Sequence, residues 1–180
     1  TVTIKNSNIK QFAPLVMAWS ISALFGDEKE LGMYMSDKLT VNIENSTVTT
    51  VAGGMIKNGS FDGAGWAPVK VDSNCVMNGG VDLNISQKST VTSLFGGHVF
   101  TSNDTKESNN QTFTMKDINI TVDDSTVGGI VTSRIQTDEA SNRANDAKVD
   151  GNFNVTLKNG AKLTSALISN QCTFGANNVY

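Results

Sequence analysis

The chain is poor in several residue types on which particular functions depend. Its 180 residues include two cysteines, two prolines and one histidine, and only 17% of them are charged. Cys75 and Cys172 are too few for a disulfide framework and lack the paired spacing of zinc ligands, so we expect unpaired thiols. A catalytic triad or histidine-containing zinc cluster would have to use His98, for which we expect a surface or packing role.

Basic clusters and long apolar runs are scarce as well. The net charge is −3, Arg134 and Arg143 are the only arginines, and the lysines are scattered. Nucleic-acid binding needs a clustered basic face, so we expect no nucleic-acid partner. The most apolar stretch, residues 12–25, is interrupted by Pro14 and is shorter than the roughly 20 residues of a membrane span. We therefore expect no membrane insertion of this segment.

Short polar side chains are abundant instead. Asn, Ser and Thr together occupy 56 positions, and hydrophobic residues make up 38% of the chain. Threonine favours strands, whereas asparagine and serine favour turns. The apolar residues are too numerous and too regularly placed for a disordered chain. This composition predicts many short strands joined by polar turns.

One pattern recurs five times along the chain. Each copy begins with an apolar–polar–apolar strand signature, continues through a polar turn, and ends in a second apolar motif. The five copies are VTIKNSNIKQFA from Val2, VNIENSTVTTVA from Val41, LNISQKSTVTSLF from Leu83, ITVDDSTVGGIV from Ile120 and VTLKNGAKLTSAL from Val155. Equivalent positions are separated by 39, 42, 37 and 35 residues. A repeat of this kind is typical of a solenoid.

We predict an all-β fold, a right-handed parallel β-helix (β-solenoid) of about five coils with long loops on one side. Residues 1–180 form a single solenoid segment in this interpretation, and the chain is expected to be a fragment of a longer protein. A β-sandwich is the alternative, although sandwich strands do not repeat one pattern at equivalent positions. Two interior ladders are predicted, Val2–Val41–Leu83–Ile120–Val155 and Ile4–Ile43–Ile85–Val122–Leu157.

The sequence also predicts structure in the inter-repeat segments, the turns and the glycine pairs. The inter-repeat segments 17–37, 56–78, 100–115 and 136–150 are expected to be loops that each contribute a third strand, for example at 68–71 and 112–115. Turn positions Asn6, Asn45 and Asp124 are expected to form a hydrogen-bonded ladder. The glycine pairs at 53–54, 96–97 and 128–129 are expected to mark sharp corners.

The outward positions of the first strand show where paired catalytic acids could lie. The two outward ladders are Thr3–Asn42–Asn84–Thr121–Thr156 and Thr1–Thr40–Asp82–Asn119–Asn154. They contain a single carboxylate, Asp82, whereas acid–base cleavage of a polysaccharide needs a pair. Asp123 and Asp124 are interpreted as solvated turn residues, and Asp27, Glu28 and Glu30 as an exposed acidic loop. We therefore predict no catalytic, cofactor-binding or metal-binding residue and no cofactor.

The repeat units resemble a known class of protein. VNIENSTVTTVAGGM, VDLNISQKSTVTSLFGGHV and INITVDDSTVGGIV resemble the degenerate repeats of bacterial surface β-helix proteins, namely autotransporter passenger domains and related adhesins. The resemblance covers nearly the whole chain through its repeats but includes no signature motif. It implies a secreted or bacterial cell-surface location and an elongated stalk or adhesin involved in virulence and cell adhesion. It assigns no functional residue.

The sequence supports three functional hypotheses. The first is a non-enzymatic adhesin or structural module that binds a host or sibling-cell surface protein or glycan through loops and outer face, and that can self-associate. The second is a polysaccharide-active β-helix, such as a lyase, glycosidase or phage tailspike, with catalytic acids in the long loops. Two of five carboxylates would then have to lie close together: Asp62, Asp72, Asp82, Asp104 and Glu107. The third is an ice- or crystal-binding solenoid, which would need a more uniform threonine array.

Two expectations concern the thiols and the ends. Cys75 precedes the third repeat and Cys172 follows the fifth, so they should lie more than two coils apart, too far for a disulfide. Neither Thr1–Ile4 nor Asn170–Tyr180 is polar enough to cap a solenoid. We expect flanking coils or a partner chain at the ends.

Overall fold

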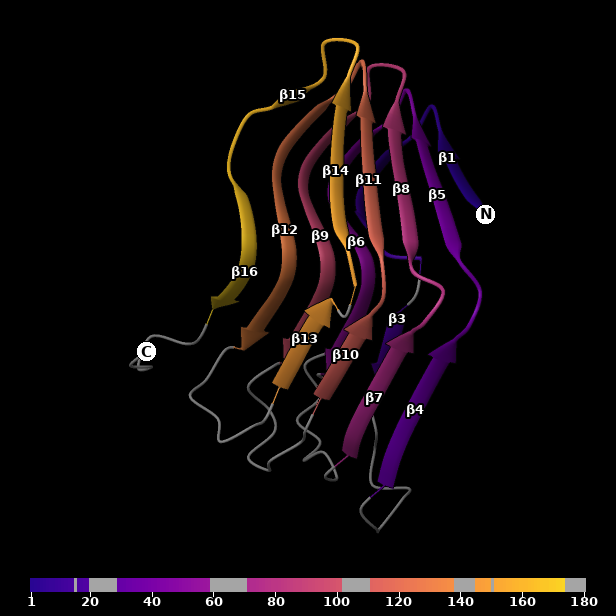
Figure 1. Ribbon diagram of the computed structural model, residues 1–180, viewed down its shortest axis with the longest axis vertical. Coiled ribbons are helices and arrows are strands. Elements are labelled where there is room, and N and C mark those ends of the chain that lie inside the picture. The colour runs from indigo at the N-terminus through magenta and orange to yellow at the C-terminus, as the bar shows by residue number, and fades with distance from the viewer. Residues whose placement is uncertain are drawn as a thin grey trace.

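The computed structural model describes residues 1–14, 16–19, 29–58, 71–101, 111–137, 145–149 and 151–173 (Figure 1). All regular elements in these residues are β-strands. They are β1 (Val2–Lys5), β2 (Asn8–Phe12), β3 (Val16–Trp19), β4 (Lys29–Met35), β5 (Leu39–Glu44), β6 (Thr47–Asn58), β7 (Val71–Met77), β8 (Val81–Ser86), β9 (Thr90–Thr101), β10 (Gln111–Met115), β11 (Ile118–Asp123), β12 (Thr126–Thr137), β13 (Asn145–Val149), β14 (Phe153–Lys158), β15 (Lys162–Leu163) and β16 (Leu167–Thr173).

The strands form three sheets, and every strand pairs with its equivalent one repeat along the chain. Sheet A has the order β1-β5-β8-β11-β14, and sheet C has the order β13-β10-β7-β4. Sheet B has the order β15-β12-β9-β6-β2, with β3 also pairing with β6 and β16 with β12. All pairings among the described strands are parallel. Figure 1 shows successive repeats lying side by side from β1 to β14.

The register of sheet A confirms the alignment of the five repeats. Val2 pairs with Val41, Val41 with Leu83, Leu83 with Ile120, and Ile120 with Val155. Parallel pairing of each strand with the equivalent strand of the next repeat is consistent with a β-solenoid. Antiparallel hairpins, which a β-sandwich would contain, do not occur among the described strands.

Apolar side chains from the three sheets form one core. On sheet A the alternation of buried and half-buried positions places Val41, Leu83 and Ile120 inside with 1% exposure or less. Sheet B contributes the second apolar motif, and sheet C contributes Met77 and Met115 at the strand ends. Residues two apart on a strand lie on the same face, so the apolar–polar–apolar signature is enough to produce this core.

The predicted interior ladders are correct except at Leu157, the final residue of the second ladder. Val122 is fully buried, whereas Leu157, which pairs with it, is 45% exposed. Val155 is half-buried. Among the described strands, β14 has a neighbour on one side only, so nothing covers the far side of Leu157.

Each inter-repeat segment contains the expected third strand. Strands β4, β7, β10 and β13 all lie within these segments and together form sheet C. Strand β10 covers the expected 112–115. The strand expected at 68–71 instead starts at Val71 as β7, and residues 68–70 lie outside the described residues.

The glycine pairs do not mark sharp corners. All three lie within long strands, because β6, β9 and β12 continue past the second apolar motif into the inter-repeat segments. The ladder between β6 and β9 skips the pair Gly53–Gly96 but resumes in the same register. A Cβ on Gly53 would lie 2.5 Å from the Gly96 carbonyl oxygen. Glycine therefore allows neighbouring backbones to approach closely, and the strands curve without a turn (Figure 1).

Pro14 occupies the position equivalent to Gly53. Phe12 pairs with Val51 and Val16 with Met55, which puts Pro14 opposite the glycine between β2 and β3. Proline has no N–H to donate to a neighbouring strand. It is tolerated at this position because the β6–β9 ladder also lacks a pair at the equivalent residue, Gly53.

Candidate interaction surface

The outer face of sheet A is the most regular polar surface among the described residues. It consists of three columns of outward side chains, which run across the strands at their spacing of about 4.8 Å. The first column is Thr40, Asp82, Asn119 and Asn154, and the second is Thr3, Asn42, Asn84, Thr121 and Thr156. The third is Lys5, Glu44, Ser86, Asp123 and Lys158.

Side-chain amides connect the repeats along the first two columns. In the first column, Asn154 Nδ2 donates to Asn119 Oδ1 at 2.9 Å, and Asn119 Nδ2 donates to Asp82 Oδ1 at 2.8 Å. In the second, Asn84 Nδ2 donates to Asn42 Oδ1 at 3.0 Å. Each of these bonds fixes a side chain that would otherwise rotate freely, so this face is an ordered array of amide and hydroxyl groups.

Asp82, the one carboxylate predicted on these two columns, is already engaged. Lys38 Nζ lies 2.8 Å from Asp82 Oδ2, while Asn119 donates to the other carboxylate oxygen. Lys38 comes from the turn between β4 and β5. No second carboxylate lies beside Asp82 in its column, so these columns hold no acid pair.

The third column contains two carboxylates that the sequence interpretation did not place on this face. Asp123 was expected in a turn, but it is the last residue of β11, and Glu44 is the last residue of β5. Glu44 pairs with Lys5 at 3.1 Å, and Asp123 accepts a 2.7 Å hydrogen bond from Asn159 Nδ2. Glu44 also accepts a 3.4 Å hydrogen bond from Gln87 Nε2, so the two carboxylates are held by different partners.

The turns that follow sheet A form a second polar ladder. Asn6, Asn45 and Asp124 all have positive φ, between 44° and 52°, a conformation that asparagine and aspartate tolerate better than most residues. Asn45 Nδ2 donates to Asn6 Oδ1 at 2.7 Å. The expected ladder is therefore present at these two asparagines.

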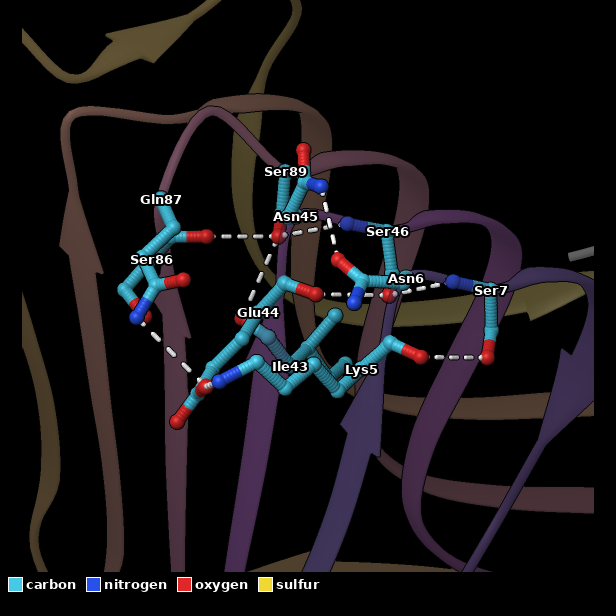
Figure 2. Close-up of polar contacts among 10 residues, drawn as sticks. All are labelled: Lys5, Asn6, Ser7, Ile43, Glu44, Asn45, Ser46, Ser86, Gln87 and Ser89. Carbon is cyan, nitrogen blue, oxygen red and sulfur yellow. Dashed lines mark hydrogen bonds and ion pairs between the residues drawn. The ribbon is translucent and has the colours of Figure 1, made fainter.

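Beneath these turns lies a serine ladder that the sequence interpretation missed (Figure 2). Ser7 N donates to Ser46 Oγ at 3.0 Å, Ser46 N to Ser89 Oγ at 3.1 Å, and Ser89 N to Ser125 Oγ at 3.1 Å. The hydroxyls of Ser46 and Ser89 donate in turn to the carbonyls of Glu44 and Ser86. Serine in every one of the first four turns was the available signal. It was obscured by the longer turn before Ser89, which shifts the residue count.

Most of the acids proposed for a catalytic groove lie outside the described residues. Asp62, Asp104 and Glu107 are among them, as are Asp27 and Glu28 of the acidic loop. The backbone of Asp72 lies in β7 and that of Glu30 in β4, where the two residues pair. Of the five candidates, only Asp72 and Asp82 lie among the described residues, and they belong to different sheets, β7 of sheet C and β8 of sheet A.

The histidine and the cysteines lie within strands. His98 is in β9, in register with Met55 and Arg134. Cys75 is in β7 of sheet C and Cys172 in β16 of sheet B. Strand β7 lies between β6 and β9 along the chain, and β16 is three pairings beyond β6 and two beyond β9 in sheet B. The two cysteines are therefore more than two repeats apart, as expected, which exceeds about 9.6 Å and the ~7 Å that a disulfide allows between Cα atoms.

The described part of the chain contains neither a metal-binding cluster nor a membrane-spanning helix. No group of three or more His, Cys, Asp or Glu side chains there is placed to hold a metal ion. No helix among those residues is long and apolar enough to cross a membrane. Comparison of the chain with models of known protein families, with curated proteins and with solved structures gave no match.

Proposed function

We propose that the chain is a right-handed β-solenoid of about five coils that serves as a non-enzymatic adhesive or structural module of a secreted or bacterial cell-surface protein. Its partner would be a protein or glycan on a host or sibling cell. Binding would use the outer face of sheet A together with the loops that connect sheets B and C.

The observation that carries this proposal is the hydrogen-bonded amide array on the outer face of sheet A. Its hydrogen bonds join Asn42 to Asn84, and Asn119 to both Asp82 and Asn154. Side chains that are already held in this way lose little further conformational freedom when a partner binds. Each amide keeps donor or acceptor capacity beyond its one or two bonds within the array. A flat, ordered and mixed polar surface of this kind suits hydrogen bonding to a sugar or to a protein surface.

The electrostatics of the same face support binding over catalysis. Asp82 and Glu44 are each paired with a lysine, and Asp123 accepts a hydrogen bond from an amide. General acid–base chemistry needs two carboxyl groups directed at one reacting bond, and these three are directed at different partners.

Two matched double variants test which face binds. Thr3→Lys with Thr121→Lys places two long charged side chains on the outer face of sheet A without removing any of its amide hydrogen bonds. Tyr34→Lys with Thr114→Lys does the same on sheet C, where Tyr34 is 68% exposed and the two residues lie in one column two repeats apart, against three repeats for Thr3 and Thr121. We expect the sheet A variant to lose binding to glycan arrays and to cultured cells, and the sheet C variant to retain it.

A reducing-sugar release assay on the same glycans tests the absence of catalysis. No release above the buffer control is expected from the unmodified chain. Sugar release that scales with protein concentration would overturn the proposal in favour of a polysaccharide-active β-helix. Binding that both double variants retain would remove the outer face of sheet A from the contact and leave the loops.

A further inference from the structure

The outer face of sheet A presents a side-chain amide on each of four neighbouring strands. Asn42 lies on β5, Asn84 on β8, Asn119 on β11 and Asn154 on β14 (Figure 1). The first two belong to the second column and the last two to the first, so the line of amides moves by one column between β8 and β11. The amides therefore repeat along the face at the strand spacing of about 4.8 Å.

The hydrogen bonds of these amides leave a regular set of donors. Among the described residues, Asn84, Asn119 and Asn154 each donate one N–H to the preceding repeat. A primary amide has two N–H groups, so each of these side chains keeps a second one. Because the amide is planar, the N–H trans to its oxygen points along a ladder of stacked amides and the other points away from Cβ. The second N–H groups are therefore directed outward on three successive strands, where the side chains are half-buried or exposed.

The charges of the same face balance one another. Two of its carboxylates, Asp82 and Glu44, are each paired with a lysine. The third, Asp123, is in register with Lys158. A face whose charges cancel gives little long-range attraction to an anionic or a cationic polymer. An uncharged ligand that accepts hydrogen bonds at regular intervals suits it better.

We propose that this face binds an uncharged polysaccharide whose sugars carry N-acetyl groups and whose chains are packed in an ordered array. This assignment rests on the proposed function and names the ligand class of its binding face. Acetamido groups of packed chains join through one N–H···O=C bond each, as peptide groups do in a sheet, so they repeat at about the same 4.8 Å. That bond uses the single N–H of each acetamide and leaves a carbonyl lone pair free. The protein thus supplies spare donors, and the polysaccharide spare acceptors, at matching spacing.

A second copy of the chain, or the sheet of another protein, fits the face less well. Face-to-face contact of two copies would take Asp82, Glu44 and their lysines out of water against the same charged groups. A polysaccharide instead offers hydroxyls, which form hydrogen bonds with both carboxylates and ammonium groups. The peptide carbonyls of a sheet also keep a free lone pair, but the side chains on each face of the sheet cover them.

Sedimentation with two insoluble polysaccharides tests the ligand class. Chitin and cellulose have the same β-linked backbone, but chitin carries an acetamido group where cellulose has a hydroxyl. We expect several-fold more of the protein to sediment with crystalline chitin than with crystalline cellulose. A soluble chitin hexamer should compete weakly, because a single chain has no stacked acetamides. Equal sedimentation with the two polymers, sedimentation with neither, or full competition by the hexamer would overturn the proposal.

Two matched double variants test the role of the amides. Asn84→Thr with Asn119→Thr removes two of the spare donors, and threonine already occurs in both columns, as at Thr40 beside Asp82 and Thr121 beside Asn84. This variant should sediment with chitin no more than with cellulose.

The control replaces two exposed asparagines that lie outside the three columns, Asn8→Thr with Asn78→Thr. Threonine occupies the position equivalent to Asn8 in the next repeat. The control should keep the preference for chitin, and circular dichroism should show that both variants are folded. A preference for chitin that the Asn84 and Asn119 variant retains would contradict the amide contact.

The outcomes also distinguish this assignment from the proposed function on which it rests. Suppose that Thr3→Lys with Thr121→Lys abolishes binding to cells and glycan arrays, while the unmodified chain sediments equally with chitin and cellulose. The face then binds a ligand of another class, and only the assignment to an N-acetylated polysaccharide fails. If the lysine variant retains all binding, both proposals fail. Dimers in size-exclusion chromatography that the Asn84 and Asn119 variant loses, without a preference for chitin, would identify a second copy as the ligand.

Discussion

Strands β11 and β14 are built from the same pattern but have different surroundings. Ile120 and Val122 of β11 are fully or almost fully buried, whereas their partners Val155 and Leu157 of β14 are half-buried and 45% exposed. Both strands alternate apolar and polar residues, and both are in sheet A. The difference is the number of neighbours, because β11 lies between β8 and β14 whereas β14 pairs with β11 alone among the described strands.

This comparison shows that burial in this fold comes from stacking more than from the residue itself. A leucine at an interior position is covered only when a repeat lies on each side of it. Sheet B behaves the same way, since Leu167 of β16 is 56% exposed while Ile130, its partner in β12, is fully buried. Stability should therefore be highest in the middle repeats and lowest in the last repeat.

The largest expected effect is the difference between two leucine truncations. Leu83→Ala, in the middle of sheet A, should lower the free energy of unfolding by about 2–5 kcal/mol, because it leaves a cavity that neighbours on both sides cannot fill. Leu157→Ala should cost about 1 kcal/mol or less, because nearly half of the side chain already contacts water. Urea unfolding followed by circular dichroism measures both.

A second measurement is needed because repeat proteins can lose an end before the rest unfolds. Hydrogen exchange at amides of β8 and β14 reports the two regions separately. Equal losses of stability for the two variants would mean that an unseen partner covers Leu157, and the comparison between middle and end would fail.

The sequence predicted the repeat register because equivalent positions keep their polarity through all five copies. The pairing of Ile4 with Ile43, and of Ile85 with Val122, follows from a period-2 pattern that permits one register only. The third strands were also predictable, since a chain that leaves sheet B must return to sheet A through a further segment. The exposure of Leu157 was not predictable from its own repeat, because it depends on what stacks beyond it.

Side-chain networks were harder to foresee than the backbone. Glu44 and Asp123 were not placed on the outer face because each is the last residue of its strand, where a turn and a strand look alike in sequence. The glycine pairs were expected at corners because glycine is common in turns. Gly53 is required instead by the 2.5 Å approach of the Gly96 carbonyl oxygen, a contact between residues far apart in the chain.

A smaller effect than that of Leu83→Ala is expected from the serine ladder. Ser89→Ala should cost about 1–3 kcal/mol, because it leaves the buried Ser46 N–H without an acceptor. Ser7→Ala is the matched control at the end of the ladder, because Ser7 Oγ donates to the Lys5 carbonyl and accepts no backbone N–H from the residues that the structure describes. Thermal unfolding of both variants tests the difference, and a Ser7 variant as unstable as the Ser89 variant would contradict it.

The smallest expected effect lies on the outer face of sheet A, where Asn119 and Asn154 form a matched pair. Among the described residues, Asn119 makes two side-chain hydrogen bonds, to Asp82 and from Asn154, whereas Asn154 makes one. Because these groups are partly exposed and water can replace a lost partner, Asn119→Ala should cost about 1 kcal/mol and Asn154→Ala about half of that. A double-mutant cycle in urea measures the coupling of the two residues. A coupling free energy near zero would mean that the amide array orders the surface without stabilising the fold. The array would then contribute to partner binding alone.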